Sequence, residues 1–483
     1  MKDRIIKGIF WLGGASLLSQ AATWLSTIVV ARILNPSDYG LIALAGIYIG
    51  FAEYVNEFGI GTAIIQKKDL DPQDIRGLYT ISILLGAAMT LLTILLAPAV
   101  AAYFKEDRLI GIIQFLSPNF LVNAAKSVQR NLMIREMKFT ELAKMDGGSR
   151  IITSLGALGL AMAGFGVWTL AAQYLLQNVI VFIWSFAYER RLPGKVVNFD
   201  RLKEMLVFGA GITGTNILYC TNRNIDQFIV GKMLGKMTLG SYSFAQTLAD
   251  KPFEKLLSIF NQVFFPVFSR IQDDPQKTKS YFMSIMEKEL FILTPIFLMI
   301  ILTAQDLVHV VLGSKWELMI LPLQLFALIA VFKYLENRIS MMYRSRGKSR
   351  AQLVFTSLVA VVMSVALFTG GKHAGLTGVL AAWGIAYPLI VMGYLRGFLL
   401  YIGISWKKFF ALFSVPLISA IVMTIPVLLT ASLFQTVSLY SLLFKIFVCL
   451  LSYSIAVLLM NRRIVNDLRD IFITQFGKTR QAV

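Results

Sequence analysis

Residues 78–97 read LYTISILLGAAMTLLTILLA, a run that holds no charged side chain. A helix of about 20 residues spans the roughly 30 Å hydrocarbon core of a bilayer. Apolar residues occupy every side of this helix, and the same holds for residues 409–433. Strands of a membrane barrel would instead alternate in polarity over about ten residues. The segment therefore predicts a transmembrane helix and an integral membrane protein.

Similar segments fill nearly the whole chain of 483 residues, which is 57% hydrophobic and 15% charged. We expect an all-α polytopic membrane protein with about 14 transmembrane helices, because backbone groups in lipid must be satisfied within the segment. No stretch is left for a soluble domain. The expected spans are 8–33, 39–66, 77–103, 109–129, 150–165, 167–188, 205–225, 239–267, 288–305, 316–337, 350–369, 374–400, 408–431 and 436–460.

The distribution of Lys and Arg predicts the orientation of these spans. The formal net charge is +19. Lys and Arg lie mainly in every second connector between the spans and do not form one patch, which argues against a nucleic-acid partner. If the N-terminus is cytoplasmic, the cytoplasmic tails and connectors hold 33 Lys and Arg, with Arg338 among them, against 6 on the opposite side. The positive-inside rule then places both termini in the cytoplasm.

An internal repeat with a spacing near 200 residues predicts two lobes. Residues 31–34 align with residues 231–234, and Gly40 aligns with Gly240. We expect an N-terminal six-helix lobe over 1–200, a C-terminal six-helix lobe over 201–402, an additional helix pair over 403–465 and a cytoplasmic tail over 466–483. Six spans is an even number, so the lobes enter the membrane in the same direction and substrate is expected between them.

Polar side chains inside the spans are the candidate functional residues, because charges at bilayer depth cost roughly 2.5–3.5 kcal/mol each. Their helical spacing places them in stripes that face protein or a water-filled cavity. The expected substrate-binding residues are Arg32, Lys126, Arg223, Lys251, Lys255, Lys333, Gln20, Asn123 and Asn216. The candidates for ion coupling are Glu53, Glu57, Asp226, Asp250 and Glu336. The alternative is that such residues only join helices or form structural ion pairs. Lys445 is interpreted as a helix-end or peripheral charge.

Other functions find little support in the residues. Cys220 and Cys449 fall within spans, and the two histidines stand apart, so neither a disulfide framework nor a metal site is expected. Residues 347–349 read Gly-Lys-Ser, like the end of a phosphate-binding loop, but Met342 stands where the first Gly belongs and no strand precedes it. We expect no cofactor, no ATP site and no enzymatic activity.

Several motifs resemble the polysaccharide exporters of the multidrug/oligosaccharidyl-lipid/polysaccharide (MOP) superfamily. They are residues 30–43 (VARILNPSDYGLIA), 57–66 (EFGIGTAIIQ), 129–139 (QRNLMIREMKF), 164–173 (GFGVWTLAAQ) and 239–245 (LGSYSFA). The chain is most similar to exporters of the teichuronic acid and colanic acid type. The resemblance implies two six-helix lobes around a central cavity, as in multidrug and toxin extrusion (MATE) transporters, with a further helix pair.

The same resemblance implies translocation of an undecaprenyl-diphosphate-linked polysaccharide repeat unit by alternating access. A glycan polymerase and glycosyltransferases are the expected partners besides the lipid-linked oligosaccharide and the bilayer. Two alternatives stay open. One is a drug or cation antiporter of the same superfamily, which would bind through the intramembrane carboxylates. The other is a membrane scaffold for glycan assembly that transports nothing.

Overall fold

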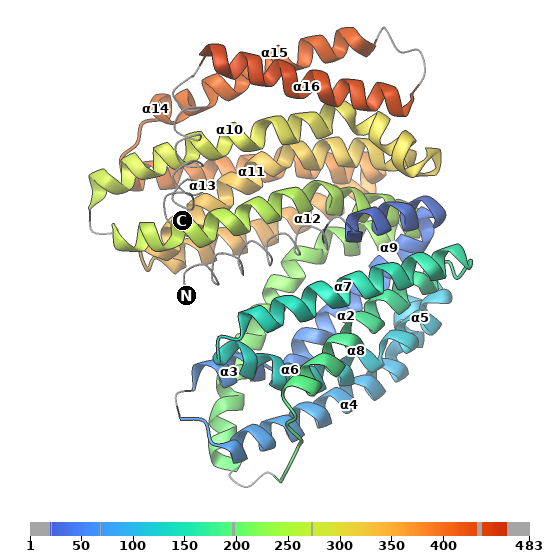
Figure 1. The fold of residues 1–483 in the computed structure, drawn as a ribbon. Helices are drawn as coiled ribbons and strands as arrows, with labels where there is room; N and C mark the ends of the chain where they lie inside the picture. The colour runs from blue at the N-terminus through green and yellow to red at the C-terminus, as the bar shows by residue number, and fades with distance from the viewer. Residues whose placement is uncertain are drawn as a thin grey trace, which may run out of the picture. The chain divides into compact units, whose positions relative to one another are not determined.

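The computed structural model describes residues 20, 22–67, 69–195, 199–271, 274–431 and 437–460. All regular structure in these ranges is helical, which confirms the predicted fold class (Figure 1). The chain divides into two compact units, Met1–Ser243 and Phe244–Val483. This division falls 43 residues after the expected lobe boundary at 200/201, and the assignment of lobes by helix count stays a prediction.

The N-terminal unit begins with the helix Ala22–Ile33, which meets α2 (Pro36–Glu57) at a bend of 116°. Asn35 and Pro36 lie at this junction, where the side chain of Asp38 accepts a hydrogen bond from the Asn35 amide at 3.0 Å. Proline at the first helical position and a returned acidic side chain both favour a helix start. The Asn-Pro-Ser-Asp sequence within the first family motif thus encodes this sharp corner.

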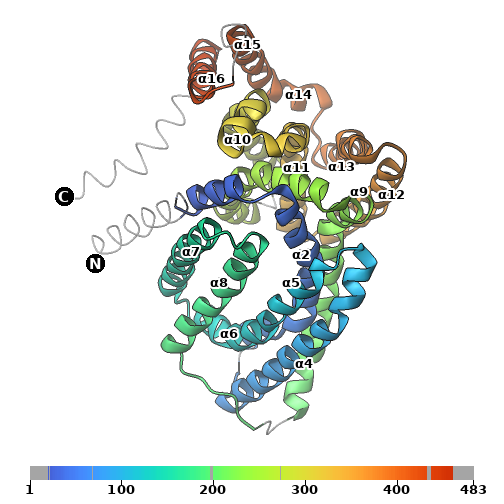
Figure 2. The same cartoon turned by 90° about the vertical axis from the view of Figure 1, so that its right-hand side faces the viewer.

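The N-terminal unit continues with α3 (Ile60–Gln66), α4 (Pro72–Phe104), α5 (Arg108–Leu116), α6 (Pro118–Arg135), α7 (Phe139–Met162), α8 (Val167–Tyr188) and the first part of α9 (Phe199–Arg270). Helix α6 packs against α4 and α8, and α8 packs against α7 (Figure 2). The expected span 167–188 coincides with α8. The expected span 39–66 does not form one helix, because it breaks between α2 and α3.

The break after α2 has a steric cause. Phe58 and Gly59 have φ angles of 45° and 63°, which lie in the left-handed region. A Cβ on Gly59 would stand 2.4 Å from the backbone of Gly209 in α9. The chain therefore turns where two backbones approach closely, and Glu57 ends α2 instead of lying in the middle of a span.

The C-terminal unit contains the end of α9, α10 (Pro275–Leu307), the turns η1 (Val308–Leu312) and η2 (Ser314–Met319), α11 (Ile320–Ser345), α12 (Ser349–Ala381), η3 (Ala382–Ala386), α13 (Tyr387–Ile402), α14 (Trp406–Phe410), η4 (Ala411–Phe413), α15 (Ser414–Ala431) and α16 (Leu439–Met460). Helices α15 and α16 pack against each other and against α10. Met423, Cys449 and Tyr453 form the core of this contact.

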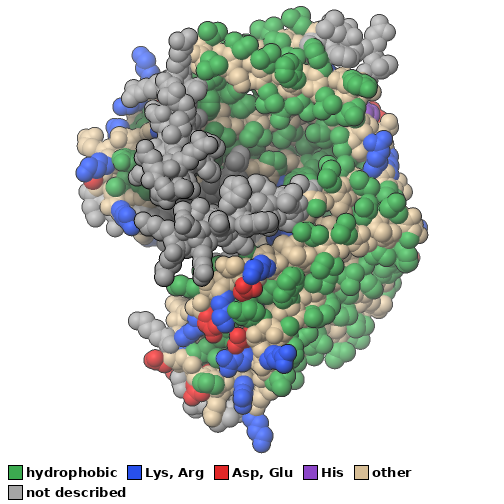
Figure 3. All heavy atoms as spheres, in the orientation of Figure 1, with side chains coloured by type: hydrophobic (Ala, Val, Ile, Leu, Met, Phe, Trp, Pro, Cys, Tyr) green, Lys and Arg blue, Asp and Glu red, His purple; other side chains and the backbone are tan. Residues whose placement is uncertain are grey.

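The helices expose apolar residues to their surroundings, as expected of a protein in lipid. Leu91 and Leu95 of α4 are 64% and 76% exposed, and hydrophobic side chains cover much of the visible surface (Figure 3). Seven helices within the described residues are long and apolar enough to cross a membrane, or eight if the bent pair counts as one span. The chain is therefore a multi-pass membrane protein, and the count of 14 spans stays a prediction.

Candidate functional site

Glu53 is the centre of a hydrogen-bonded cluster inside the N-terminal unit. Its carboxylate Oε1 accepts hydrogen bonds from the Asn119 and Asn123 amides of α6, at 2.7 and 2.9 Å. The hydroxyl of Tyr174 on α8 donates to the same oxygen at 2.7 Å. Asn119 and Asn123 lie one turn apart on α6 and so present their amides on one face. Three helices thus converge on one intramembrane carboxylate.

Lys126 belongs to the same cluster through an amide bridge. Its Nζ donates to Oδ1 of Asn178, while Nδ2 of Asn178 donates to Oδ1 of Asn119 at 2.7 Å. Asn178 follows Tyr174 by one helical turn, so α8 places both side chains beside α6. The amides separate the ammonium from the Glu53 carboxylate and link the two charges electrostatically.

A pocket of about 300 Å³ opens beside this cluster. Its charged and polar lining comes from α2, α4 and α6 and comprises Glu53, Asn56, Glu57, Ser82, Asn123, Lys126, Ser127, Arg130 and Asn131. Two carboxylates and two cations therefore share one small space in helices that are otherwise apolar. Such a density of convergent polar groups in a concave site is typical of ligand binding.

Two further groups shape the chemistry of the pocket. Arg130 forms a forked ion pair with Asp146 of α7, with both N–O distances at 2.8 Å, which holds its guanidinium in one orientation. Asn56 is 3% exposed and donates to the carbonyl of Phe120 at 3.0 Å. Its Oδ1 is buried and has no hydrogen-bond partner within the described part of the chain.

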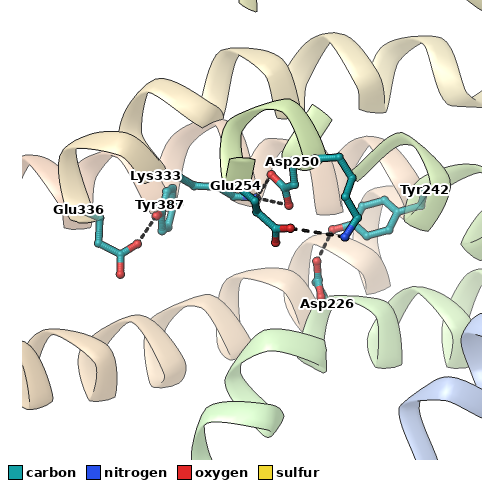
Figure 4. A network of polar contacts seen from close by, with 8 residues as sticks. Asp226, Tyr242, Asp250, Glu254, Lys333, Glu336 and Tyr387 are labelled. Carbon is teal, nitrogen blue, oxygen red and sulfur yellow. Dashed lines mark hydrogen bonds and ion pairs between the residues drawn. The ribbon is translucent and has the colours of Figure 1, made fainter. Parts of the chain in front are cut away.

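Five of the other predicted site residues form separate pairs, and these four pairs are drawn in Figure 4. In the C-terminal unit Lys333 lies 2.8 Å from the Asp250 carboxylate, and the Tyr387 hydroxyl donates to Glu336 at 2.5 Å. Lys251 and Glu254 form an exposed pair at 3.5 Å. In the N-terminal unit the Tyr242 hydroxyl donates to Asp226 at 2.8 Å.

The structure thus brings together four of the predicted residues, Glu53, Glu57, Asn123 and Lys126, in one pocket. The five other predicted residues of the N-terminal unit do not line it, namely Gln20, Arg32, Asn216, Arg223 and Asp226. The side chain of Lys255 lies outside the described residues. The roles assigned to all these residues stay predictions.

Sequence reasoning missed the contribution of α8. Tyr174 and Asn178 are the polar residues that complete the Glu53 cluster. Their spacing of four residues places both on one face of a largely apolar helix, and this pattern could have indicated their role. Their partners are more than 50 residues away in the sequence, so spacing alone does not connect them to Glu53.

Two interpretations of charged residues were wrong. Arg338 was assigned to a cytoplasmic connector, but it is 1% exposed within α11, beside Glu289. Lys445 lies in the second turn of α16 but is not peripheral, because its Nζ lies 2.6 Å from the Asp306 carboxylate and its side chain is 13% exposed. In both cases an acidic residue on α10 compensates the buried cation.

Comparison with solved structures gives the class of the fold. The lipid II flippase MurJ, in an inward closed conformation, aligns with a TM-score of 0.74 over 97% of this chain and 99% of its own, at 14% identity. An inward-facing MATE multidrug resistance transporter of the MOP superfamily aligns with a TM-score of 0.63 over 80% and 94%, at 14% identity. The fold is therefore that of MOP-superfamily transporters, as the motifs predicted.

Sequence comparison gives the family. The family model described as "Polysaccharide biosynthesis protein" matches residues 29–321, and the chain belongs to this family. The Escherichia coli lipopolysaccharide biosynthesis protein WzxC is 25% identical over 78% of this chain and 77% of its own length. The Bacillus subtilis teichuronic acid biosynthesis protein TuaB is 22% identical over 71% of each.

Proposed function

We propose that this protein is a flippase that exports an undecaprenyl-diphosphate-linked polysaccharide repeat unit by alternating access. The observation that carries the proposal is the pocket that Glu53, Asn123, Lys126 and Arg130 line inside apolar helices. Support also comes from the family and from a Rhizobium meliloti relative named as a succinoglycan biosynthesis transport protein, which is 23% identical over 63% of this chain. A teichuronic acid-like cell-wall or extracellular glycan is the proposed cargo class.

The chemistry of the pocket suits a glycosyl diphosphate. Lys126 and Arg130 supply cations for phosphate oxygens. Because the fork of Arg130 is occupied by Asp146, Arg130 binds phosphate through its remaining N–H groups. Asn56, Asn123 and Asn131 supply amides that hydrogen-bond sugar hydroxyls. A volume of about 300 Å³ is at the lower end of the range for small-ligand sites, so this pocket holds the head of the cargo and not a whole repeat unit.

The direction of transport follows from the charge of the cargo. Moving one negative charge outward across an inside-negative membrane gains about 2.3 kcal/mol per 100 mV. We place both termini in the cytoplasm of a bacterial cell, with the prenyl tail in lipid throughout. Export then needs neither ATP nor covalent chemistry on this chain, and the glycosyltransferases and polymerase act before and after it.

A second candidate, a drug or cation antiporter, is favoured by one observation. Glu53 and Glu57 line the same pocket, and two carboxylates in one pocket suit a lipophilic cation or a coupling ion. Arg130 and Lys126 oppose this assignment, because they raise the electrostatic potential at the place where a cation would bind.

Reconstituted transport decides between the two. Proteoliposomes that contain only this protein are loaded with a labelled undecaprenyl-diphosphate oligosaccharide, with and without an imposed potential. Translocation that requires the protein supports the flippase. It should become faster when the potential is negative on the side that the anionic cargo leaves. Absence of translocation, together with uptake of a lipophilic cation against a proton or sodium gradient, would move the assignment to the antiporter.

A further inference from the structure

The turn between α11 and α12 carries a concentrated positive charge. Arg344, Arg346, Lys348 and Arg350 fall within seven residues, and no Asp or Glu occurs between Glu336 and Asp467. The turn is well defined, because the Lys348 amide donates to the Tyr343 carbonyl at 2.8 Å and the Gly347 amide donates to the Arg344 carbonyl at 3.0 Å. This is the hydrogen-bond pattern of a glycine helix stop, with Gly347 at a φ of 69°.

A pocket of about 710 Å³ lies beside this turn, entirely within the C-terminal unit. Its lining residues are Tyr343, Gly347, Lys348, Arg350, Ala351, Val354, Gly393, Tyr394 and Gly397. The charged lining is therefore cationic only, and no amide or carboxylate side chain belongs to it. Among the described residues, neither Lys348 nor Arg350 forms an ion pair, so both charges are available to an anion.

Aromatic rings build the wall of this pocket and position its cations. Tyr343 and Tyr401 stack at 5.6 Å, and Tyr394 stacks on Phe355 at 4.0 Å. The Nζ of Lys348 lies 4.4 Å from the centre of the Tyr401 ring. This cation–π contact holds the ammonium at the rim of the pocket. Tyrosines with cations beside them are typical of the level of lipid headgroups in membrane proteins.

The floor of the pocket continues into an exposed apolar surface. Gly393 and Gly397 of α13 have no atom within 4 Å of the place where a Cβ would stand, so they leave a channel along the helix. Leu389, one turn earlier on the same face, is 68% exposed. On α12, Val354 and Val361 are 61% and 65% exposed. An acyl chain fits this strip, because the strip is apolar and lies at the surface of the helices.

We propose that this pocket is a binding site for an anionic phospholipid of the bilayer. The phosphate binds Lys348 and Arg350, and an acyl chain lies over Val354 and the two glycines of α13. Basic pockets between membrane helices bind phosphate-bearing headgroups in this way. The lack of amide and carboxylate lining argues against a glycan, and therefore against the cargo lipid, as the occupant. The proposal is independent of what the protein transports.

The test uses the purified full-length protein and native mass spectrometry with phosphatidylglycerol or phosphatidylcholine added. We expect selective retention of phosphatidylglycerol. The double variant Lys348→Gln, Arg350→Gln should weaken it by about tenfold or more, because each basic residue near the surface contributes to anionic lipid binding. Gly393→Leu should weaken it as well, with all charges kept, because its side chain fills the open channel.

The matched control is the double variant Lys407→Gln, Lys408→Gln, which removes two exposed cations of α14 that do not line the pocket. It should retain phosphatidylglycerol, and thermal unfolding of every variant shows that each is folded. Equal retention in the wild type and both pocket variants would overturn the site, as would an equal loss in the control. Displacement by soluble glycerol phosphate at the same concentration, or preferential binding of undecaprenyl phosphate, would overturn the phospholipid as its occupant.

Discussion

The Nε of Arg338 on α11 lies 3.4 Å from Oε2 of Glu289 on α10, and their side chains are 1% and 2% exposed. Tyr334 donates its hydroxyl to the same oxygen at 2.6 Å. Such a pair costs much desolvation energy, and its mutual attraction compensates that cost only while both partners are present. The pair thus links α10 to α11 inside the C-terminal unit.

Replacing Arg338 with Met should destabilise the protein by about 3–5 kcal/mol, because Glu289 would stay buried without its counter-ion. The double variant Arg338→Met, Glu289→Leu should recover most of this loss, since no buried charge is left. Thermal unfolding in detergent, followed by tryptophan fluorescence, measures both effects. Arg396→Met on α13 is the control, because Arg396 is exposed. A double variant as unstable as the single one would contradict the ion-pair explanation.

The position of Arg338 also shows what sequence patterns can and cannot predict. Hydropathy identified the apolar core of α11 but ended the span at residue 337, so the next cation was assigned to a loop. Its burial depends on Glu289, which lies 49 residues earlier and on another helix. The same holds for Lys445 and Asp306, which are 139 residues apart. Apolar length predicts helices well, whereas the compensation of buried charge is a property of tertiary packing.

The sequence predicted those residues of the candidate site that are close together on one helix, and it did not predict contacts between helices. Asn123 and Lys126 follow each other on one face of α6, and Glu53 and Glu57 do so on α2, so helical spacing identified these four residues. The break at Phe58 and Gly59 was not predicted, because Gly is common in membrane helices and only the approach of Gly209 requires it. The spacing of residues along each helix also does not predict the contact between Tyr174 of α8 and Glu53 of α2.

Neutralising Lys126 should abolish export without affecting membrane insertion. In Lys126→Gln the amide keeps a hydrogen-bonding group beside Asn178, but the pocket loses one of its two cations. We expect at least a tenfold slower translocation of the labelled lipid-linked oligosaccharide in proteoliposomes, since a charge-assisted hydrogen bond contributes about 1.5–3 kcal/mol. Lys144→Gln, which removes an exposed cation paired with Glu141, should translocate normally. Normal transport by Lys126→Gln would exclude this pocket as the phosphate site.

The Glu53 carboxylate should be needed to organise the pocket. Glu53→Ala leaves the donors of Asn119, Asn123 and Tyr174 without their common acceptor. Asn119 is fully buried, and an unpaired buried group costs about 1–3 kcal/mol. Glu53→Gln keeps one oxygen and should be closer to wild type in stability. Unfolding temperatures of the two variants, compared with that of Glu141→Gln, whose residue does not line the pocket, measure the difference. Equal stability of Glu53→Ala and wild type would show that the hydrogen bonds contribute nothing.

Transport by the same two variants separates organisation from ion coupling. If Glu53 only positions amides, Glu53→Gln should translocate the lipid-linked oligosaccharide nearly as fast as wild type. If it binds a coupling ion, Glu53→Gln should lose all dependence on a proton or sodium gradient while it stays folded. The hydrogen bonds from three donors to one oxygen favour the first result, because they leave little of that oxygen for an ion.

Two glycines of α2 should respond in opposite directions to the same substitution. A Cβ on Gly40 would stand 1.8 Å from the carbonyl oxygen of Lys236 in α9, so Gly40→Ala requires the helices to move apart and should cost about 1–3 kcal/mol. A Cβ on Gly46 would have no atom within 4 Å, so Gly46→Ala should stabilise the helix by about 0.4–1 kcal/mol. Thermal unfolding of the two variants in parallel checks the sign. Stabilisation by both substitutions would mean that α2 and α9 do not approach through Gly40, and that the aligned positions Gly40 and Gly240 are small for some other reason.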